Sequence, residues 1–239
     1  MSLPITFETF GVHAILVSWP NEINQSTSMD IFNFKQKIHQ SIPEHIVETV
    51  PAYCSLTIFM KNQVNQQELI NKLKKLYQHT DNTTQASTII WEIPVCYDLQ
   101  FGTDLTTLAQ IKTCSTQRIV ELHSQALYTV DFLGFLPGFP YLSGLNPLLH
   151  TPRLTKPRAV VKKGSVAIGG KQTGVYPIES PGGWHIIGRT PVSFFNPHDS
   201  QPSFISPLDK IKFQPVSMTD FNSIEKQPKY KIKKAYQDD

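Results

Sequence analysis

Cysteine, net charge and long apolar runs are all scarce in this chain of 239 residues. Its three cysteines, Cys54, Cys96 and Cys114, show no CxxC spacing, which argues against a disulfide framework or a zinc knot and favours a reducing compartment. A formal net charge of +3 is too small to indicate nucleic-acid binding. No stretch approaches the roughly 18 apolar residues of a membrane span, and the N-terminus lacks the basic and apolar regions of a signal peptide. We therefore expect a cytoplasmic protein that binds neither nucleic acid nor membrane.

The common catalytic and metal-binding motifs are also missing. The segment GSVAIGGKQTG (164–174) invites comparison with a Walker A loop, which requires a glycine six residues before the lysine and a hydroxyl after it. Ser165 and Gln172 occupy those two positions, so the segment does not fit. The motifs GxSxG, HExxH and GxGxxG are absent, and no two histidines are spaced i, i+4. The sequence therefore identifies no catalytic residue and no metal site.

Glycine, by contrast, is concentrated in one stretch. Ten of the twelve glycines lie between Gly134 and Gly188, where they alternate with β-branched and aromatic residues. Glycine is used where the backbone needs a positive φ or where another chain approaches closely. The pattern predicts short strands joined by tight turns, and we place the working surface of the protein here.

The N-terminal part predicts a small α+β domain over residues 1–92. Alternation predicts a strand over Phe7–Trp19, and apolar residues at helical spacing predict a helix near 31–38. The elements that follow are strands at 46–50 and 55–60, an amphipathic helix at 66–79, a loop at 80–85 and a strand at 88–95. This β-α-β-α-β order, with a split middle strand, is typical of a ferredoxin-like sandwich. We expect this domain to serve in packing and in contacts with a partner.

A second domain is expected over residues 93–225, and it begins with two helices at 104–113 and 115–124. The pair could be a DNA-binding helix-turn-helix, but the second helix offers only Arg118 as a cation and also carries Glu121. We therefore interpret it as a packed helical pair. His123, near its end, is either a packed imidazole or a functional group.

Residues Phe132–Leu145 place four aromatics, three glycines and two prolines in 14 residues. This segment predicts a rigid core-forming hairpin, an apolar groove for a flat or proline-like ligand, or both. Strands and turns then alternate over Arg158–Pro191 at a spacing of roughly 10 residues, which predicts a small closed or half-closed β barrel. The C-terminal run 226–239 contains five lysines and is expected to be a basic, solvated tail.

Polar and aromatic residues of the glycine-rich stretch are the candidates for a binding site. Polar side chains there can orient a carboxylate, amide or phosphate through charge-assisted hydrogen bonds, and Gln172 and Thr173, held between glycines, are preferred. The predicted substrate- or partner-binding residues are His123, Phe135, Pro137, Gly138, Phe139, Arg158, Gly170, Gln172, Thr173, Tyr176 and Arg189.

Longer motifs resemble a known family. The segments FLGFLPGFPYL (132–142), TPR (151–153), GSVAIGGKQTGVYPIESPGGW (164–184) and IGRTP (187–191) are similar to allophanate hydrolase subunit 1. That family includes the kinase inhibitor KipI and the B subunit of bacterial ATP-dependent 5-oxoprolinase. The resemblance is strong over residues 90–215, and it implies a cyclophilin-like β barrel preceded by a small α+β domain.

The resemblance also implies partners and a reaction. Homologous C and A subunits would join this chain to open 5-oxo-L-proline to L-glutamate, with ATP used in the assembled complex. Under this hypothesis we expect Gln172, Thr173 and Arg189 to be donors to the substrate, and no metal is predicted from this chain. Because the chain has no phosphate-cradling loop, we expect it to be inactive alone. Two alternatives stay open: a KipI-like inhibitor that binds a sensor histidine kinase, and a carboxyltransferase module related to urea carboxylase.

Overall fold

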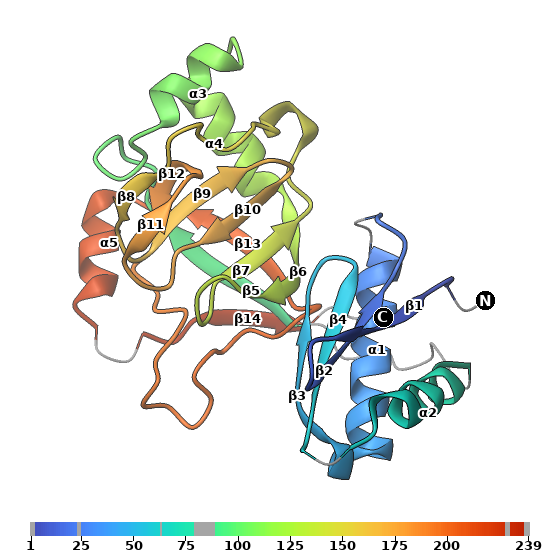
Figure 1. Ribbon diagram of the computed structural model, residues 1–239. Coiled ribbons are helices and arrows are strands. Elements are labelled where there is room, and N and C mark those ends of the chain that lie inside the picture. Colours follow the sequence, from blue (N-terminus) through green and yellow to red (C-terminus); the bar gives the residue numbers. More distant parts are fainter. Residues whose placement is uncertain (1–2, 23–24, 63, 79–88, 228–229, 237–239) are drawn as a thin grey trace. The chain divides into compact units, whose positions relative to one another are not determined.

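The computed structural model describes residues 3–22, 25–62, 64–78, 89–227 and 230–236. The chain divides into two compact units, 1–86 and 87–239, each with its own hydrophobic core (Figure 1). None of the helices in the described ranges is both long enough and apolar enough to cross a bilayer. The loop predicted at 80–85 lies outside the described residues.

The first unit is an α+β sandwich. Its elements are β1 (Thr6–Phe10), β2 (Ala14–Ser18), α1 (Gln25–Ser41), the 3-10 turn η1 (Pro43–His45), β3 (Ile46–Pro51), β4 (Ser55–Met60) and α2 (Gln66–Gln78). The strands form an antiparallel sheet in the order β1-β2-β4-β3. Ile15 of β2 and Ile58 of β4 are fully buried in one cluster with Phe34 of α1 and Leu73 of α2, so both helices pack on the same face of the sheet.

Two expectations for this unit are wrong. The single strand expected over Phe7–Trp19 is a hairpin, because Gly11 adopts a φ of 65° and lets the chain reverse between β1 and β2. The strand expected at 88–95 does not join this sheet, since β5 (Ile89–Val95) pairs with strands of the second unit. The ferredoxin-like topology is therefore not confirmed, because β1 pairs with β2 at the sheet edge that β5 was expected to fill.

The second unit is built around a curled, mixed sheet of eight strands (Figure 1). Its remaining elements are α3 (Leu105–Ile111), α4 (Thr116–Gln125), β6 (Leu127–Leu133), β7 (Pro140–Ser143), the 3-10 turn η2 (Pro147–Leu149), β8 (Arg158–Val161), β9 (Ser165–Gly169), β10 (Gln172–Val175), β11 (Ser180–Gly182), β12 (His185–Arg189), β13 (Lys210–Pro215), α5 (Met218–Glu225) and β14 (Lys233–Tyr236). The strand order is β12-β9-β10-β7-β6-β13-β5-β14, with β5 and β13 parallel. Strands β8 and β11 form a separate pair.

The curled sheet is joined to itself at one seam. Cys96, just after β5, and Arg189, at the end of β12, exchange two backbone hydrogen bonds of 2.9 Å each. Gly188 permits this approach, because a Cβ at that position would lie 2.9 Å from the Cys96 carbonyl oxygen. A curled sheet joined in this way agrees with the expected cyclophilin-like barrel.

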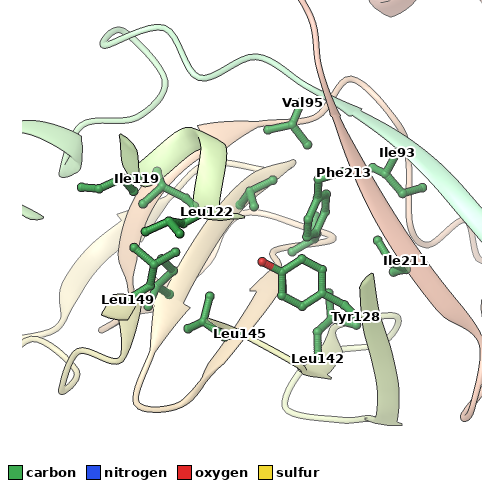
Figure 2. Close-up of a cluster of buried hydrophobic side chains, with 14 of the residues drawn as sticks. Ile93, Val95, Ile119, Leu122, Tyr128, Leu142, Leu145, Leu149, Ile211 and Phe213 are labelled. Atoms are coloured by element: carbon green, nitrogen blue, oxygen red, sulfur yellow. The ribbon is translucent and has the colours of Figure 1, made fainter. Parts of the chain in front are cut away.

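Helix α4 contributes to the core of this barrel. Figure 2 shows Leu122 of α4 in the same cluster of buried side chains as Tyr128, Leu142 and Phe213, which come from β6, β7 and β13. The two expected helices are present as α3 and α4, and Ser115 caps α4 by accepting a hydrogen bond of 3.1 Å from the backbone N–H of Arg118. Because its apolar side is buried against the sheet, α4 has the structural role expected of a packed helical pair.

The segment expected to be a solvated tail includes a strand. Residues Lys233–Tyr236 form β14 and pair antiparallel with β5, where Lys233 lies opposite Glu92. Opposite charges facing each other across a strand pair are favourable. Tyr230 and Ile232, which precede the strand, pack against the barrel core.

Candidate functional site

The connection between β6 and β7, residues 134–139, is a tight turn that we name the aromatic turn. Two backbone hydrogen bonds form within the turn. The N–H of Leu136 donates to the carbonyl of Gly134 (2.8 Å), and the N–H of Phe139 donates to the carbonyl of Leu136 (3.0 Å). Gly138 has a φ of 78°, and a Cβ there would lie 2.7 Å from that of Phe195. Phe135 has a φ of 66°, although bulky residues rarely adopt positive φ, and it is 62% exposed. Such strain concentrates at ligand-binding sites.

A pocket of ≈ 380 Å³, which we name the turn pocket, opens beside the aromatic turn. This volume falls within the range of about 300–1,000 Å³ that small-molecule sites occupy. The lining residues are Phe135, Leu136, Phe139, Tyr141, Arg153, Leu154, Pro157, Tyr176, Ser180, Pro181, Gly182, Gly183 and Trp184. They come from the aromatic turn, from β7, from the segment before β8 and from the segment around β11.

The aromatic walls of the turn pocket hold one another in fixed orientations. Phe139 meets Tyr176 edge-on at 5.2 Å and Trp184 edge-on at 5.5 Å between ring centroids. Tyr141 lies 5.8 Å from Trp184. Because Phe139, Tyr176 and Trp184 are each at most 5% exposed, their rings have little freedom and the pocket is preformed.

Arg153 is the only cation among the lining residues of the turn pocket. Its guanidinium lies 5.6 Å from the centroid of the Trp184 ring, over the ring face. Burial raises the pKa of Tyr141 and of Tyr176, and the charge of Arg153 partly offsets each shift. Within the described residues, Arg153 forms no ion pair with an acidic side chain. Apolar walls beside an uncompensated guanidinium suit a small flat molecule that carries a carboxylate.

Three of the predicted binding residues line this pocket, namely Phe135, Phe139 and Tyr176. Pro137 and Gly138 belong to the aromatic turn and shape it without lining the pocket. The other six do not line the turn pocket, and they are His123, Arg158, Gly170, Gln172, Thr173 and Arg189.

His123 and Thr173 are bonded to each other inside the barrel, and both are fully buried. The Thr173 hydroxyl donates to the carbonyl of Ala167 (2.9 Å), so its oxygen accepts from Nε2–H of His123 (2.9 Å). The other ring nitrogen, Nδ1, accepts from the hydroxyl of Tyr97 (2.8 Å). Burial lowers the pKa of His123 to about 3, so the ring stays neutral. Neither side chain is accessible to a ligand.

The side chain of Gln172 lies on the opposite face of β10 from that of Thr173, and it forms a hydrogen bond with another side chain of the protein. Its Nε2 donates to Asp131 (3.2 Å), whose second oxygen accepts from the Ser143 hydroxyl (2.7 Å). Burial raises the pKa of Asp131 to about 6, and the two hydrogen bonds oppose the shift. Gly170, with a φ of 66°, makes the turn from β9 to β10 and exchanges backbone hydrogen bonds with Thr151. The pair preferred from sequence, Gln172 and Thr173, thus connects the sheet to neighbouring side chains.

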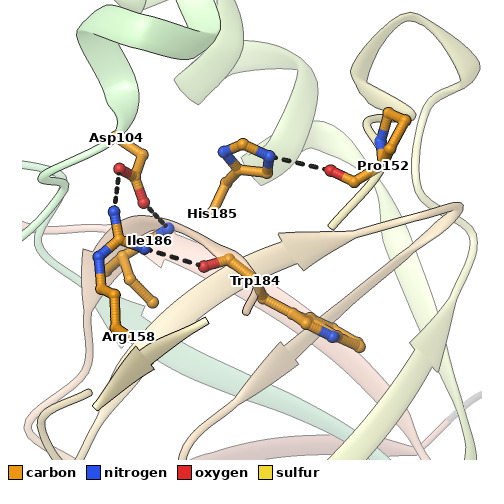
Figure 3. Close-up of polar contacts among 6 residues, drawn as sticks. All are labelled: Asp104, Pro152, Arg158, Trp184, His185 and Ile186. Carbon is orange, nitrogen blue, oxygen red and sulfur yellow. Dashed lines mark hydrogen bonds and ion pairs between the residues drawn. The ribbon is translucent and has the colours of Figure 1, made fainter. Parts of the chain in front are cut away.

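The side chains of Arg158 and Arg189 also form contacts with other groups of the protein. A guanidinium nitrogen of Arg158 lies 2.5 Å from a carboxylate oxygen of Asp104, as Figure 3 shows. The Nε–H of Arg189 donates to the carbonyl of Lys163 (2.9 Å). Both arginines line a different cavity from the turn pocket.

Sequence reasoning did not single out Arg153, Tyr141 or Trp184. Each lies in a motif that carried the family resemblance, so a signal existed, but Arg153 and Trp184 are far apart in the chain and only the fold brings them together. Within the described residues, no group of three His, Cys, Asp or Glu side chains is placed to hold a metal ion.

Comparison with known proteins identifies the family. The family model described as carboxyltransferase domain, subdomain C and D, matches residues 5–205. The chain is 42% identical over 206 residues to the 5-oxoprolinase B subunit of Escherichia coli O157:H7, covering 86% of this chain and 93% of that protein. It is 31% identical over 238 residues to the 5-oxoprolinase B subunit of Bacillus subtilis (strain 168), covering 95% of this chain and 99% of that protein.

A solved structure supports the fold. The crystal structure of the K. lactis urea amidolyase matches with a TM-score of 0.83 at 22% identity, and the match covers 99% of this chain and 16% of that one. At this identity the match shows a shared fold. With the family model and the two relatives, we conclude that the chain belongs to the family of carboxyltransferase subdomains C and D that includes the 5-oxoprolinase B subunits.

Proposed function

We propose that this chain is the B subunit of an ATP-dependent 5-oxoprolinase, which opens the lactam of 5-oxo-L-proline to L-glutamate together with A and C subunits. The observation that carries the proposal is the turn pocket, a preformed aromatic cavity of ≈ 380 Å³ with one arginine in its wall. Membership of a family that includes 5-oxoprolinase B subunits supports it.

The chemistry of the turn pocket matches this substrate. The molecule 5-oxo-L-proline is a compact five-membered lactam that carries one carboxylate. We place its ring between the aromatic walls of Phe139, Tyr141 and Trp184. Its carboxylate then meets the guanidinium of Arg153, which the face of Trp184 holds in position. Residues 180–183 form the opposite wall of the pocket, and the carbonyl of Gly183 there already accepts a hydrogen bond of 2.7 Å from the backbone N–H of Leu154.

Arg153 takes the role that the sequence suggested for Gln172, Thr173 and Arg189. In the structure those three side chains bond to Asp131, His123 and the Lys163 carbonyl respectively. Using Gln172 or Thr173 for a substrate would break bonds that the fold already makes, at a cost of about 1 kcal/mol or more for each. Arg189 does not line the turn pocket. Arg153 carries no such cost, because it has no acidic partner within the described residues.

Lactam opening needs activation because amide resonance resists attack by water. We propose that ATP phosphorylates the lactam oxygen in the assembled complex. Water then adds to the ring carbon and the C–N bond breaks, which releases the amine and leaves γ-glutamyl phosphate. A second water hydrolyses this acyl phosphate to L-glutamate and phosphate. In this scheme the residues of the turn pocket bind and orient the ring, while the partner subunits complete the site. The sequence contains no Walker A loop, so we expect the isolated chain to be inactive.

Co-expression with A and C subunits tests the proposal by an assay of glutamate release from 5-oxo-L-proline. We expect release that depends on ATP and on this chain, and none from the chain alone. A parallel preparation with the E. coli relative in place of this chain is the control that shows whether the partner subunits are active. If that control is active and the preparation with this chain is not, the proposed function is wrong. Turnover by the chain alone would contradict only its expected inactivity.

Carboxyl transfer is a second candidate, favoured by the family model and by the fold shared with the urea amidolyase. The same preparation distinguishes the two candidates when it is supplied with urea and a carboxylated biotin carrier. Consumption of the carboxyl group without glutamate release would favour carboxyl transfer. The KipI-like inhibition of a sensor histidine kinase stays a prediction from the sequence resemblance.

A further inference from the structure

A second cavity of the barrel unit differs in character from the turn pocket. It has a volume of ≈ 420 Å³ and shares no lining residue with the turn pocket. The charged residues in its lining are Arg158, Lys162 and Arg189, and Thr103 and Ser165 also line it. None of its described lining residues is acidic. We name this cavity the basic pocket.

Arg158 is fixed at the wall of the basic pocket by Asp104. One oxygen of Asp104 lies 2.5 Å from the guanidinium, and the other accepts a hydrogen bond of 2.6 Å from the backbone N–H of Ile186. Both contacts are drawn in Figure 3. A second guanidinium nitrogen donates to the carbonyl of Trp184 (3.4 Å). The side chain of Asp104 is only 9% exposed, whereas that of Arg158 is 34% exposed. The buried carboxylate therefore anchors one edge of a guanidinium whose remaining surface stays accessible.

Arg189 is fixed by two aromatic rings. Its guanidinium carbon lies 5.5 Å from the ring centroid of Phe101 and 5.7 Å from that of Phe221. Its Nε–H donates to the carbonyl of Lys163, and its nearest carboxylate, on Glu225, is 3.7 Å away. The charge is thus held in place more by the rings and the carbonyl than by a close ion pair.

Lys162 supplies a third, adaptable charge. It follows β8 directly and its side chain is exposed, so its ammonium can adjust to a bound anion. Two fixed guanidinium groups and one adaptable ammonium around a cavity without lining carboxylates repel a metal ion and favour an anion with several oxygens.

We propose that the basic pocket is a binding site for a phosphate group, either inorganic or carried by a nucleotide. Phosphate oxygens accept the parallel N–H bonds that guanidinium groups offer, and positioning the guanidiniums in advance reduces the entropy lost on binding. The site does not depend on the function proposed for the turn pocket, because the two cavities have no residue in common.

Titration calorimetry of the full chain with pyrophosphate, ADP and adenosine tests this site. We expect pyrophosphate and ADP to bind and adenosine not to bind, with affinities that fall as salt is added. Displacement of ADP by pyrophosphate assigns the site to the phosphate group alone. Binding of ADP without binding of pyrophosphate assigns it to the phosphate of a nucleotide. Absence of binding by both at millimolar concentrations overturns the proposal.

Charge-reversal variants locate the binding. Lys162→Glu is expected to weaken pyrophosphate or ADP binding about tenfold or more, because it replaces an attraction with a repulsion. Lys171→Glu is the matched control, since Lys171 is exposed on the turn between β9 and β10 and lines neither pocket. Equal loss in both variants, or no loss in Lys162→Glu, contradicts the site. Arg189→Gln should also weaken the binding of pyrophosphate or ADP. If that variant does not fold, the comparison of Lys162→Glu with Lys171→Glu alone decides whether the site exists.

Discussion

At the scale of single residues, burial decides which polar side chains can act on a ligand. His123 is fully buried, stacked on Phe213 with ring centroids 4.8 Å apart, and hydrogen-bonded at both nitrogens. Arg153 is exposed at the wall of the turn pocket and has no acidic partner within the described residues. The histidine therefore has a structural role in the core, and Arg153 is the contact that we propose for an anionic substrate.

The pH dependence of stability should reveal the buried histidine. The unfolded chain binds a proton on this residue below pH about 6.5, whereas folded His123, with a pKa of about 3, resists it. Its contribution to stability is thus complete above pH about 6.5 and is lost as the pH falls towards 3. Between pH 6 and 4, the free energy of unfolding of the parent should fall more steeply than that of His123→Gln, by up to about 1.4 kcal/mol per pH unit.

Urea denaturation at several pH values measures this difference. His198→Gln is the control, because His198 is exposed, and it should follow the parent. Parallel curves for the parent and His123→Gln contradict the assignment of His123 as a buried neutral group.

A substitution at Phe135 should weaken substrate binding with little effect on the stability of the fold. Phe135→Gly removes a strained positive φ, worth about 1 kcal/mol, and adds a similar loss of chain entropy, so the free energy of unfolding should change by less than about 0.5 kcal/mol. The change also removes one wall of the turn pocket, so the KM for 5-oxo-L-proline in the assembled enzyme should rise.

Phe139→Ala is the contrast to this variant. Phe139 is 1% exposed, so its truncation should cost about 3–5 kcal/mol in urea denaturation. A large loss of stability in Phe135→Gly would show that its backbone is not strained.

At the scale of elements, the aromatic turn depends on one glycine. Gly138→Ala would place a Cβ 2.7 Å from the Cβ of Phe195 and 2.9 Å from the Phe194 carbonyl oxygen, at a positive φ. We expect a loss of about 2–4 kcal/mol. Gly170→Ala is the matched control, because its φ is also positive and its Cβ would meet nothing within 4 Å, so the cost should stay near 1 kcal/mol. Equal losses in urea denaturation would show that the packing around Gly138 adds nothing.

Local patterns predicted most of these elements but not their partners. Patterns among neighbouring residues encode the amphipathic stripe of α2 and the glycine-bounded strands β9 and β10. These elements form where expected. The assignment of β5 to the barrel depends on pairing with β13, more than a hundred residues away, and nothing local encodes it. The hairpin of β1 and β2 was missed because Gly11 interrupts an otherwise continuous alternation.

The candidate site was predictable to the same degree. The density of aromatics and glycine marked the aromatic turn, which lies beside a pocket. Polar residues between glycines marked Gln172 and Thr173 equally well, but alternation along β10 sends one to Asp131 and the other to His123. A polar residue that completes a core network and one that meets a ligand have the same sequence signal, and only burial separates them.

At the scale of the whole molecule, the curled sheet of the second unit closes on itself through the seam between Cys96 and Arg189. Gly188→Val would place its Cβ 2.9 Å from both the Cys96 carbonyl oxygen and a methyl group of Val95. The seam would have to open, and we expect the free energy of unfolding to fall by about 3 kcal/mol or more. Gly183→Val is the control, because its Cβ would meet nothing closer than 3.6 Å. Similar unfolding curves for the two variants contradict the role of the seam.

We propose that the turn pocket binds the ring of 5-oxo-L-proline and that Arg153 binds its carboxylate. The most direct measurement is the steady-state kinetics of glutamate release by the assembled enzyme with Arg153→Gln, beside Arg118→Gln, an exposed arginine on α4 away from the pocket. We expect Arg153→Gln to raise the KM for 5-oxo-L-proline about tenfold or more, through loss of a charge-assisted pair, and Arg118→Gln to leave this KM unchanged. An unchanged KM in Arg153→Gln would contradict this proposal.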